Sequence, residues 1–290
     1  KPVVIAPAMN TNMYESPATQ EAIRTLSQWD NITMLDAASG ELACGTTGKG
    51  RMQEVDVLVA AAEYALTPKT MAGKHVVITA GPTQEAIDPV RYISNASTGK
   101  MGYSLVRACL NRGAEVTLVS GPTHLSLKAW QQFCPLRVEN VVSSAAMCEA
   151  TVAAFEQADI AILCAAVADF TPCTTADKKI KKQPGQDGMV VELKTTTDIA
   201  ATLGASKQAH QRLVGFALET HDEQANALRK LQSKNLDMIV LNSLQDQGAG
   251  FGVDTNKVTL LFADGTKKDL PLLLKQEVAD VIVESILQLI

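Results

Sequence analysis

A polar loop between a predicted strand at 75–79 and a predicted helix carries side chains suited to chemistry. Gly99 lacks a Cβ, so the backbone there can approach a ligand closely, and the free N–H groups of the helix that follows favour an anion. The loop is long for a strand-to-helix connection, and such loops are more often functional than idle. We predict a nucleotide or phosphate site, with a purely structural loop as the alternative. The loop also carries Glu85, Asp88, Arg91 and Asn95.

Two standard phosphate-binding patterns are absent from this loop. Where a Walker A loop has its first glycine, this chain has Ser94, and Met101 occupies the position of the Ser or Thr that would hold magnesium. A complete GxGxxG is absent as well. The chemistry of the loop therefore has to be read from its longer sequence.

The stretch at 78–102, ITAGPTQEAIDPVRYISNASTGKMG, resembles the signature of the phosphopantothenate–cysteine ligase family, the second half of the bifunctional coenzyme A biosynthesis flavoproteins. The resemblance implies that 4′-phosphopantothenate is joined to L-cysteine through an acyl-cytidylate, with CTP and Mg²⁺ as cofactors. It also implies that Asn95 acts as a catalytic residue that holds the acyl-cytidylate, while Arg91 and Lys100 bind substrate. No residue is predicted as a metal ligand.

A buried strand predicted at 160–164 is followed by the small residues at 165–168 and by Asp169. Small residues at the carboxyl end of a parallel strand let a ligand lie against the sheet. From sequence alone Asp169 is either a ligand-binding carboxylate or a helix or turn cap. By resemblance, Ala165, Ala166 and Asp169 line the nucleotide site.

The segment 171–188 contains four lysines around Ile180, between prolines and glycines that make it irregular. A solvated charged face is one interpretation, and a cationic lid that neutralises phosphates is the other. The resemblance favours the lid and makes Lys179 the residue that acts on the activated acyl intermediate and contacts the nucleotide. The preceding Lys178 departs from the common family pattern.

Further nucleotide-contacting positions follow from the resemblance. Lys230 and Lys234 are four residues apart, so they share one face of a predicted helix at 221–234. A solvent-exposed stripe is the alternative for them. Thr220 to Glu223 predicts a capping box for that helix. The remaining predicted contacts are Thr197, Asp198, Ile199 and Phe216.

The N-terminal stretch resembles a second activity. Residues 7–13, PAMNTNM, are similar to the PxMNxxM motif of flavin-dependent phosphopantothenoylcysteine decarboxylases. The glycine-rich run at 40–52 is expected to form a mobile flap or a ligand-wrapping loop, and it resembles the substrate flap of those enzymes. The resemblance implies that Met9 and Asn10 bind FMN and that Cys44 is the catalytic proton donor. The chain begins as a strand without Met, and we expect that it lacks the flavin-binding first half and does not decarboxylate alone.

The order of elements predicts the fold class. From residue 74 onward, strands and helices alternate, which indicates an α/β fold: a Rossmann-like parallel sheet with helices on both faces, the ligase domain. The C-terminal remnant of a flavodoxin-like domain precedes it. We predict a decarboxylase part at 1–70 and a ligase domain at 74–290.

Composition limits the possible partners. The net charge of −5 over 290 residues argues against nucleic acid, and the sequence has no apolar run long enough to span a membrane. The six cysteines form no CxxC pair, which favours a reduced, cytoplasmic protein. By resemblance, the ligase half is expected to form a homodimer.

Two other classes of function fit parts of the sequence. A short-chain NAD(P) oxidoreductase fits the βαβ pattern, but no Tyr in the sequence is followed four residues later by Lys. A non-catalytic assembly module is supported in part by residues 1–66. The polar residues of the ligase signature argue against it for the whole chain.

Overall fold

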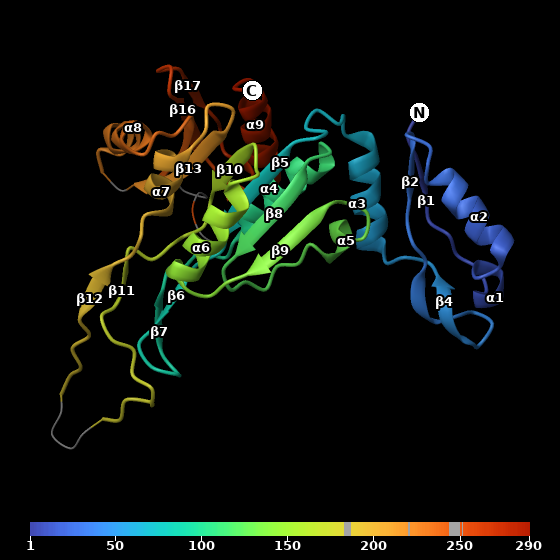
Figure 1. Ribbon diagram of the computed structural model, residues 1–290, viewed down its shortest axis with the longest axis horizontal. Helices are drawn as coiled ribbons and strands as arrows, with labels where there is room; N and C mark the ends of the chain where they lie inside the picture. Colours follow the sequence, from blue (N-terminus) through green and yellow to red (C-terminus); the bar gives the residue numbers. More distant parts are fainter. Residues whose placement is uncertain (183–186, 220, 244–249, 251) are drawn as a thin grey trace. The chain divides into compact units, whose positions relative to one another are not determined.

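The computed structural model describes residues 1–182, 187–219, 221–243, 250 and 252–290 (Figure 1). The chain separates into two compact units. Unit 1 comprises residues 1–73, 109–115 and 126–136, and unit 2 comprises 74–108, 116–125 and 137–290. No helix in the described ranges has the length and apolar character needed to cross a membrane. The predicted domain boundary at 70–74 remains a prediction.

Unit 2 is built on a mostly parallel sheet, as predicted. β10 pairs in parallel with β5 on one side and β13 on the other, and β13 pairs in parallel with β14. The last two strands pair antiparallel. In spatial order the strands are β17 (Lys267–Asp269), β16 (Val258–Phe262), β14 (Met238–Ser243), β13 (Arg212–Glu219), β10 (Ile160–Leu163), β5 (His75–Ala80), β8 (Glu115–Ser120) and β9 (Leu136–Asn140).

The strand order reverses between β5 and β10. After β5 the chain adds β8 and β9 on one side, and it then returns to place β10, β13 and β14 on the other. The carboxyl ends of the strands at such a switch point leave a crevice that loops do not fill. The fold therefore predicts a ligand site beyond Ala80 and Leu163.

Helices cover both faces of this sheet. Successive strand residues point to opposite faces, so strands that are apolar throughout need a helix on each side. On one face, Val77, Ala161 and Leu213 pack with α6 (Ser144–Phe155), α7 (Ile199–Ser206) and α8 (Glu223–Ser233) in one buried cluster. On the other, Ala80 lies against Gly102 in α4 (Lys100–Asn111), where a Cβ on the glycine would come within 2.5 Å of the alanine Cβ. α9 (Lys275–Leu287) closes the unit and buries Val278, Ala279, Ile282, Val283 and Ile286.

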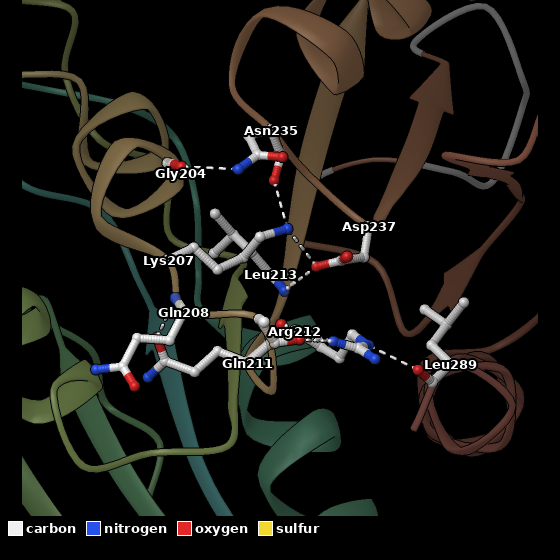
Figure 2. A network of polar contacts seen from close by, with 10 residues as sticks. Gly204, Lys207, Gln208, Gln211, Arg212, Leu213, Asn235, Asp237 and Leu289 are labelled. Atoms are coloured by element: carbon white, nitrogen blue, oxygen red, sulfur yellow. Dashed lines mark hydrogen bonds and ion pairs between the residues drawn. The ribbon is translucent and has the colours of Figure 1, made fainter.

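A polar network holds the amino ends of the strands together (Figure 2). Lys207 Nζ lies 2.8 Å from Asp237 Oδ2, which also accepts from the amide of Leu213. Asn235 Nδ2 donates to Gly204 O, and Arg212 Nε donates to Leu289 O. These contacts tie β13, α7 and the chain terminus together at the edge opposite the crevice.

Three small antiparallel ladders extend unit 2. β6 (Gln84–Ala86) pairs with β7 (Tyr92–Ser94), β11 (Phe170–Pro172) with β12 (Leu193–Thr195), and β15 (Thr255–Asn256) with β18 (Leu273–Leu274). The first of these occupies the polar loop of the ligase signature.

Unit 1 has a two-stranded parallel ladder and a hairpin. β1 (Val3–Ile5) pairs with β2 (Ile32–Met34), and β3 (Ala38–Glu41) pairs antiparallel with β4 (Thr47–Arg51). The four helices are α1 (Thr11–Tyr14), α2 (Pro17–Leu26), α3 (Val55–Leu66) and α5 (Lys128–Gln131). Ser16 caps α2 through the amide of Thr19.

The glycine-rich run at 40–52, predicted as a mobile flap or a ligand-wrapping loop, belongs to the paired hairpin β3–β4, and its glycines come close to residues 9–11. One local prediction was wrong. The capping box of α8 does not form: Asp222 occupies the N-cap in the left-handed region (φ 44°) and gives no side-chain cap bond. Thr220, the other residue predicted for that box, lies outside the described residues.

Candidate functional site

A cleft of about 640 Å³ opens at the carboxyl edge of the sheet in unit 2. Its walls are the carboxyl ends of β5, β10 and β13, the start of α4, and the start of α7 with the loop before it. This volume is within the range of small-molecule and nucleotide sites. Most predicted nucleotide or substrate residues line it: Asn95, Lys100, Ala165, Ala166, Asp169, Thr197, Asp198, Ile199, Phe216, Lys230 and Lys234.

Asn95 is fixed by the loop after β10. Its Nδ2 donates to the carbonyl oxygens of Ala166 and Val167, at 3.0 and 3.1 Å. Both amide hydrogens are thereby used, which leaves Oδ1 to accept a hydrogen bond from a ligand. The neighbouring Ser94 donates from Oγ to Thr83 O, in the segment between β5 and β6.

The start of α4 provides a backbone site for an anion. Gly99 has φ of 81°, a conformation that favours glycine, and it is buried where the loop enters the helix. Gly102 lets the helix lie directly on β5, as its contact with Ala80 shows. The free amides of the first helical turn therefore border the cleft.

Lys230 of α8 and Lys234, the C-cap residue of α8, line the cleft already paired with carboxylates. Lys230 Nζ lies 2.6 Å from Glu219 Oε1, and Lys234 Nζ lies 2.8 Å from Asp198 Oδ2. Burial works to raise the pKa of Asp198, but hydrogen bonds from Lys234 and from backbone amides of α7 outweigh it, so this pKa lies below its ordinary value. Asp198 also caps α7 through the amide of Ala201.

Lys275 is a cleft residue that the sequence analysis missed. Its side chain is only 6% exposed, and its Nζ donates to the carbonyl oxygens of Gly250 and Val253. Burial and the nearby Lys100 lower its pKa. Lys100 itself is 2.6 Å from Asp254 Oδ1, and both lysines line the cleft. No spacing signal pointed to Lys275, which opens a helix far along the chain.

Two carboxylates of the signature loop are used to build the fold. Glu85 is buried and accepts from the amide of Ser144 at the start of α6. Asp88 accepts from Arg91 and from the amide of Ile180 at 3.1 Å. The hydrogen bonds from Arg91, with help from nearby backbone amides, hold the pKa of Asp88 well below its ordinary value.

Arg91 and Lys179 are not brought to the cleft within this chain. Arg91 Nη2 donates to Ile180 O at 2.7 Å and so anchors the lysine-rich segment. Lys179 is exposed on that segment, which projects away from the sheet between β11 and β12 (Figure 1). Residues 183–186 of the predicted lid lie outside the described residues.

In unit 1 the predicted decarboxylase residues lie together. Asn10 Nδ2 is 3.3 Å from Cys44 Sγ, and Thr46 Oγ1 is 3.1 Å from the same sulfur. Met9 donates its amide to Gly50 O at 2.9 Å. Hydrogen bonds from Thr46 and then Asn10 hold the pKa of the exposed Cys44 thiol below its ordinary value.

Known families match both units. The family described as DNA/pantothenate metabolism flavoprotein C-terminal domain matches residues 71–290, and the flavoprotein family matches residues 1–66. The chain belongs to the DNA/pantothenate metabolism flavoprotein family. This membership supports the ligase prediction over the short-chain oxidoreductase alternative.

Relatives in this family carry two kinds of name. The coenzyme A biosynthesis bifunctional protein CoaBC of Bacillus subtilis is 50% identical over 98% of this chain and 69% of its own length. A cysteine/cysteine sulfinic acid decarboxylase from an unknown prokaryotic organism is 50% identical over 100% of this chain and 80% of its own length. The crystal structure of the C-terminal domain of a CoaBC protein is similar with TM-score 0.63 and 39% identity, covering 76% of this chain and 97% of that one.

Proposed function

We propose that unit 2 joins 4′-phosphopantothenate to L-cysteine, with cleavage of CTP to CMP and pyrophosphate, as a step of coenzyme A biosynthesis. One observation carries the proposal: the cleft at the switch point gathers Asn95, the start of α4 and the lysines of α8 around one volume. CTP and the substrates would share this cleft.

The proposed reaction has two steps. A carboxylate oxygen of phosphopantothenate attacks the α-phosphorus of CTP, and the bond to the β-phosphate breaks as pyrophosphate leaves. The cysteine nitrogen then attacks the acyl carbon, the carbon–oxygen bond breaks, and CMP leaves with the electron pair while the amine proton passes to solvent. Both steps need neutralised phosphates and fixed geometry more than covalent help from the protein.

The cleft residues supply these needs. Asn95 Oδ1 would orient the acyl intermediate, because its amide hydrogens are held by Ala166 and Val167. Lys230 and Lys234 would face the nucleotide next to Phe216, and Ala165, Ala166 and Asp169 would border it. Lys100, Lys275 and the first amides of α4 would attract phosphate at the other end.

Mg²⁺ is proposed to enter with the triphosphate. Within the described ranges, no group of three or more His, Cys, Asp or Glu side chains is placed to hold a metal ion. The ion would add positive charge to the phosphates, as in other phosphoryl-transfer sites. No protein ligand is assigned to it.

We propose that the ligase part acts as a homodimer. Four exposed apolar side chains lie on or beside the paired hairpins β6–β7 and β11–β12, namely Val90, Tyr92, Phe170 and Leu193. A second copy would bury them, and it would also give Arg91 and Lys179 a cleft to reach, that of the partner. A monomer by light scattering at micromolar concentration would contradict this.

Unit 1 is proposed to serve FMN-dependent decarboxylation of 4′-phosphopantothenoylcysteine. Met9, Asn10 and Cys44 fit this role because the Cys44 thiol lies against the side-chain amide of Asn10. Met9 and Asn10 belong to residues 7–10, which we call the PAMN loop. FMN, when bound, would accept two electrons from the substrate so that the carboxylate can leave as CO₂, and would return them to the resulting ene-thiol, to which Cys44 would add the proton. The six free cysteines agree with a cytoplasmic location, which also remains a proposal.

The test is pyrophosphate release from CTP with Mg²⁺ and 4′-phosphopantothenate, with and without cysteine. We expect pyrophosphate in both cases and CMP only when cysteine is present. Release from ATP but not CTP would keep the mechanism and change the nucleotide. Absence of pyrophosphate from a folded, dimeric sample would contradict the proposed function.

A further inference from the structure

The β3–β4 hairpin of unit 1 is held closely against the PAMN loop. A Cβ on Gly50 would lie 2.2 Å from Met9 O, and a Cβ on Gly48 would lie 2.4 Å from Thr11 Oγ1. The amide of Met9 donates to Gly50 O at 2.9 Å. Glycine is therefore required at 50 for close approach to the backbone of Met9, and at 48 for close approach to the side chain of Thr11.

A polar contact fixes the base of the same hairpin. Asp36, just before β3, accepts from the Tyr14 hydroxyl at 2.6 Å and from Lys49 Nζ at 2.7 Å. Tyr14 is 3% exposed, whereas the side chain of Asp36 is largely open to solvent and that of Lys49 is partly open. An exposed ion pair contributes little, so the charge-assisted bond from the buried Tyr14 is the stronger of the two. Gln53 Nε2 also donates to Asp36 O.

The tip of the hairpin carries Cys44 to the PAMN loop. Its sulfur has Asn10 Nδ2 and Thr46 Oγ1 as neighbours, at 3.3 and 3.1 Å. Asn10 is itself fixed, because its Oδ1 accepts from the amide of Asn12 at 2.9 Å. The thiol therefore keeps its amide partner only while the hairpin stays docked.

We propose that Asp36 is a positioning residue for the Cys44 thiol: by joining Tyr14 and Lys49 it docks the hairpin so that Cys44 meets Asn10. The catalytic meaning of this placement rests on the decarboxylase role proposed for unit 1. Asp36 does not touch the thiol and acts through the hairpin.

The docking has a measurable consequence for the thiol. Hydrogen-bond donors aimed at a sulfur favour its thiolate form. The titratable groups that face the base of the hairpin are Tyr14, Asp36 and Lys49. If the hairpin undocks, Cys44 loses Asn10 and its titration moves toward that of an ordinary thiol. Asp36→Asn should undock the hairpin because the neutral amide loses the charge that both donors need.

The experiment is alkylation of the full chain by iodoacetamide between pH 6 and 10, with each cysteine followed by peptide mass spectrometry. For Asp36→Asn we expect a higher pH midpoint at Cys44 and about threefold slower alkylation at pH 7. Tryptic cleavage after Arg51 should become faster. The exposed Cys173 in unit 2 is an internal reference that should not change.

Controls separate docking from other effects. Asn10→Ala should raise the Cys44 midpoint without faster cleavage after Arg51. Glu21→Gln, which removes a solvent-exposed ion pair with Arg24, should change neither. Tyr14→Phe should resemble Asp36→Asn, and Lys49→Arg should resemble the unaltered chain.

Wild-type values for Cys44 in both Asp36→Asn and Tyr14→Phe would overturn the proposal. So would an equal shift at Cys173, because that would indicate general unfolding. These thiol measurements need neither FMN nor CTP. A docked, acid-shifted Cys44 in a complete flavoprotein that fails to decarboxylate would instead contradict the proposed function alone.

Discussion

At both edges of the sheet in unit 2, a lysine lies 2.8 Å from an aspartate and an asparagine donates to a backbone carbonyl. At the amino edge, Lys207 and Asp237 are 10% and 22% exposed and bind further groups of the fold (Figure 2). At the carboxyl edge, Lys234 and Asp198 are 25% and 47% exposed and border the cleft. The pair at the amino edge is the more buried, and the pair at the carboxyl edge is open enough to exchange partners with the nucleotide proposed for the cleft.

The largest expected difference concerns the two asparagines. Asn95→Asp should lower CMP formation about 100-fold, because a carboxylate would face two carbonyl oxygens and lose the fixed amide. Asn235→Asp should cost about 1 kcal/mol of stability and leave turnover unchanged. Stopped-flow pyrophosphate release and CMP assays would measure both. Full CMP formation in Asn95→Asp would remove the role assigned to Asn95.

The lysines provide the second comparison. Lys234→Met should raise the KM for CTP about tenfold, since one cation that would face the nucleotide beside Phe216 is lost. Lys207→Met should lower the free energy of unfolding by about 2 kcal/mol, because it leaves Asp237 without its buried partner. Urea titrations and initial rates would be measured for both variants. Equal changes in the KM for CTP in Lys234→Met and Lys207→Met would contradict a functional difference between the two edges.

A smaller effect is expected from Lys275 and Arg212, whose side chains donate to backbone carbonyl oxygens. Lys275→Met should weaken CTP binding about fivefold, through loss of positive charge at the α4 end of the cleft. Arg212→Met should loosen the last turn of the chain at Leu289 and cost about 1 kcal/mol. Isothermal titration with CTP and thermal melts would separate these effects. Unchanged CTP affinity in Lys275→Met would show that its charge is purely structural.

The smallest effect is the pH dependence of the Lys234–Asp198 pair. The folded-state pKa of Asp198 lies below its ordinary value, so its stabilising contribution is complete above the ordinary value of about 4 and is lost as the pH falls through the folded-state pKa. Thermal melts of the unaltered chain and Asp198→Asn should differ at neutral pH and converge below about pH 4. A constant difference across that range would contradict this linkage.

Much of the architecture was predictable from local signals. The strands predicted at 75–79 and 160–164 are confirmed as β5 and β10, because short apolar runs rich in β-branched residues favour buried strands. The α/β fold follows because alternating strands and helices form a parallel sheet with its site at the carboxyl edge. The glycine-rich hairpin was missed because the sequence does not show that its glycines face residues 9–11.

The sequence by itself determined the order of elements, the family and most residues of the cleft, because these are carried by local patterns and by a long polar signature. Only the tertiary structure decided how those residues are used. It placed Glu85 and Asp88 in the framework, brought the distant Lys275 to the cleft, and left Arg91 and Lys179 outside it. The reason is physical: a side chain's role depends on its burial and partners, and those come from segments far apart in the sequence.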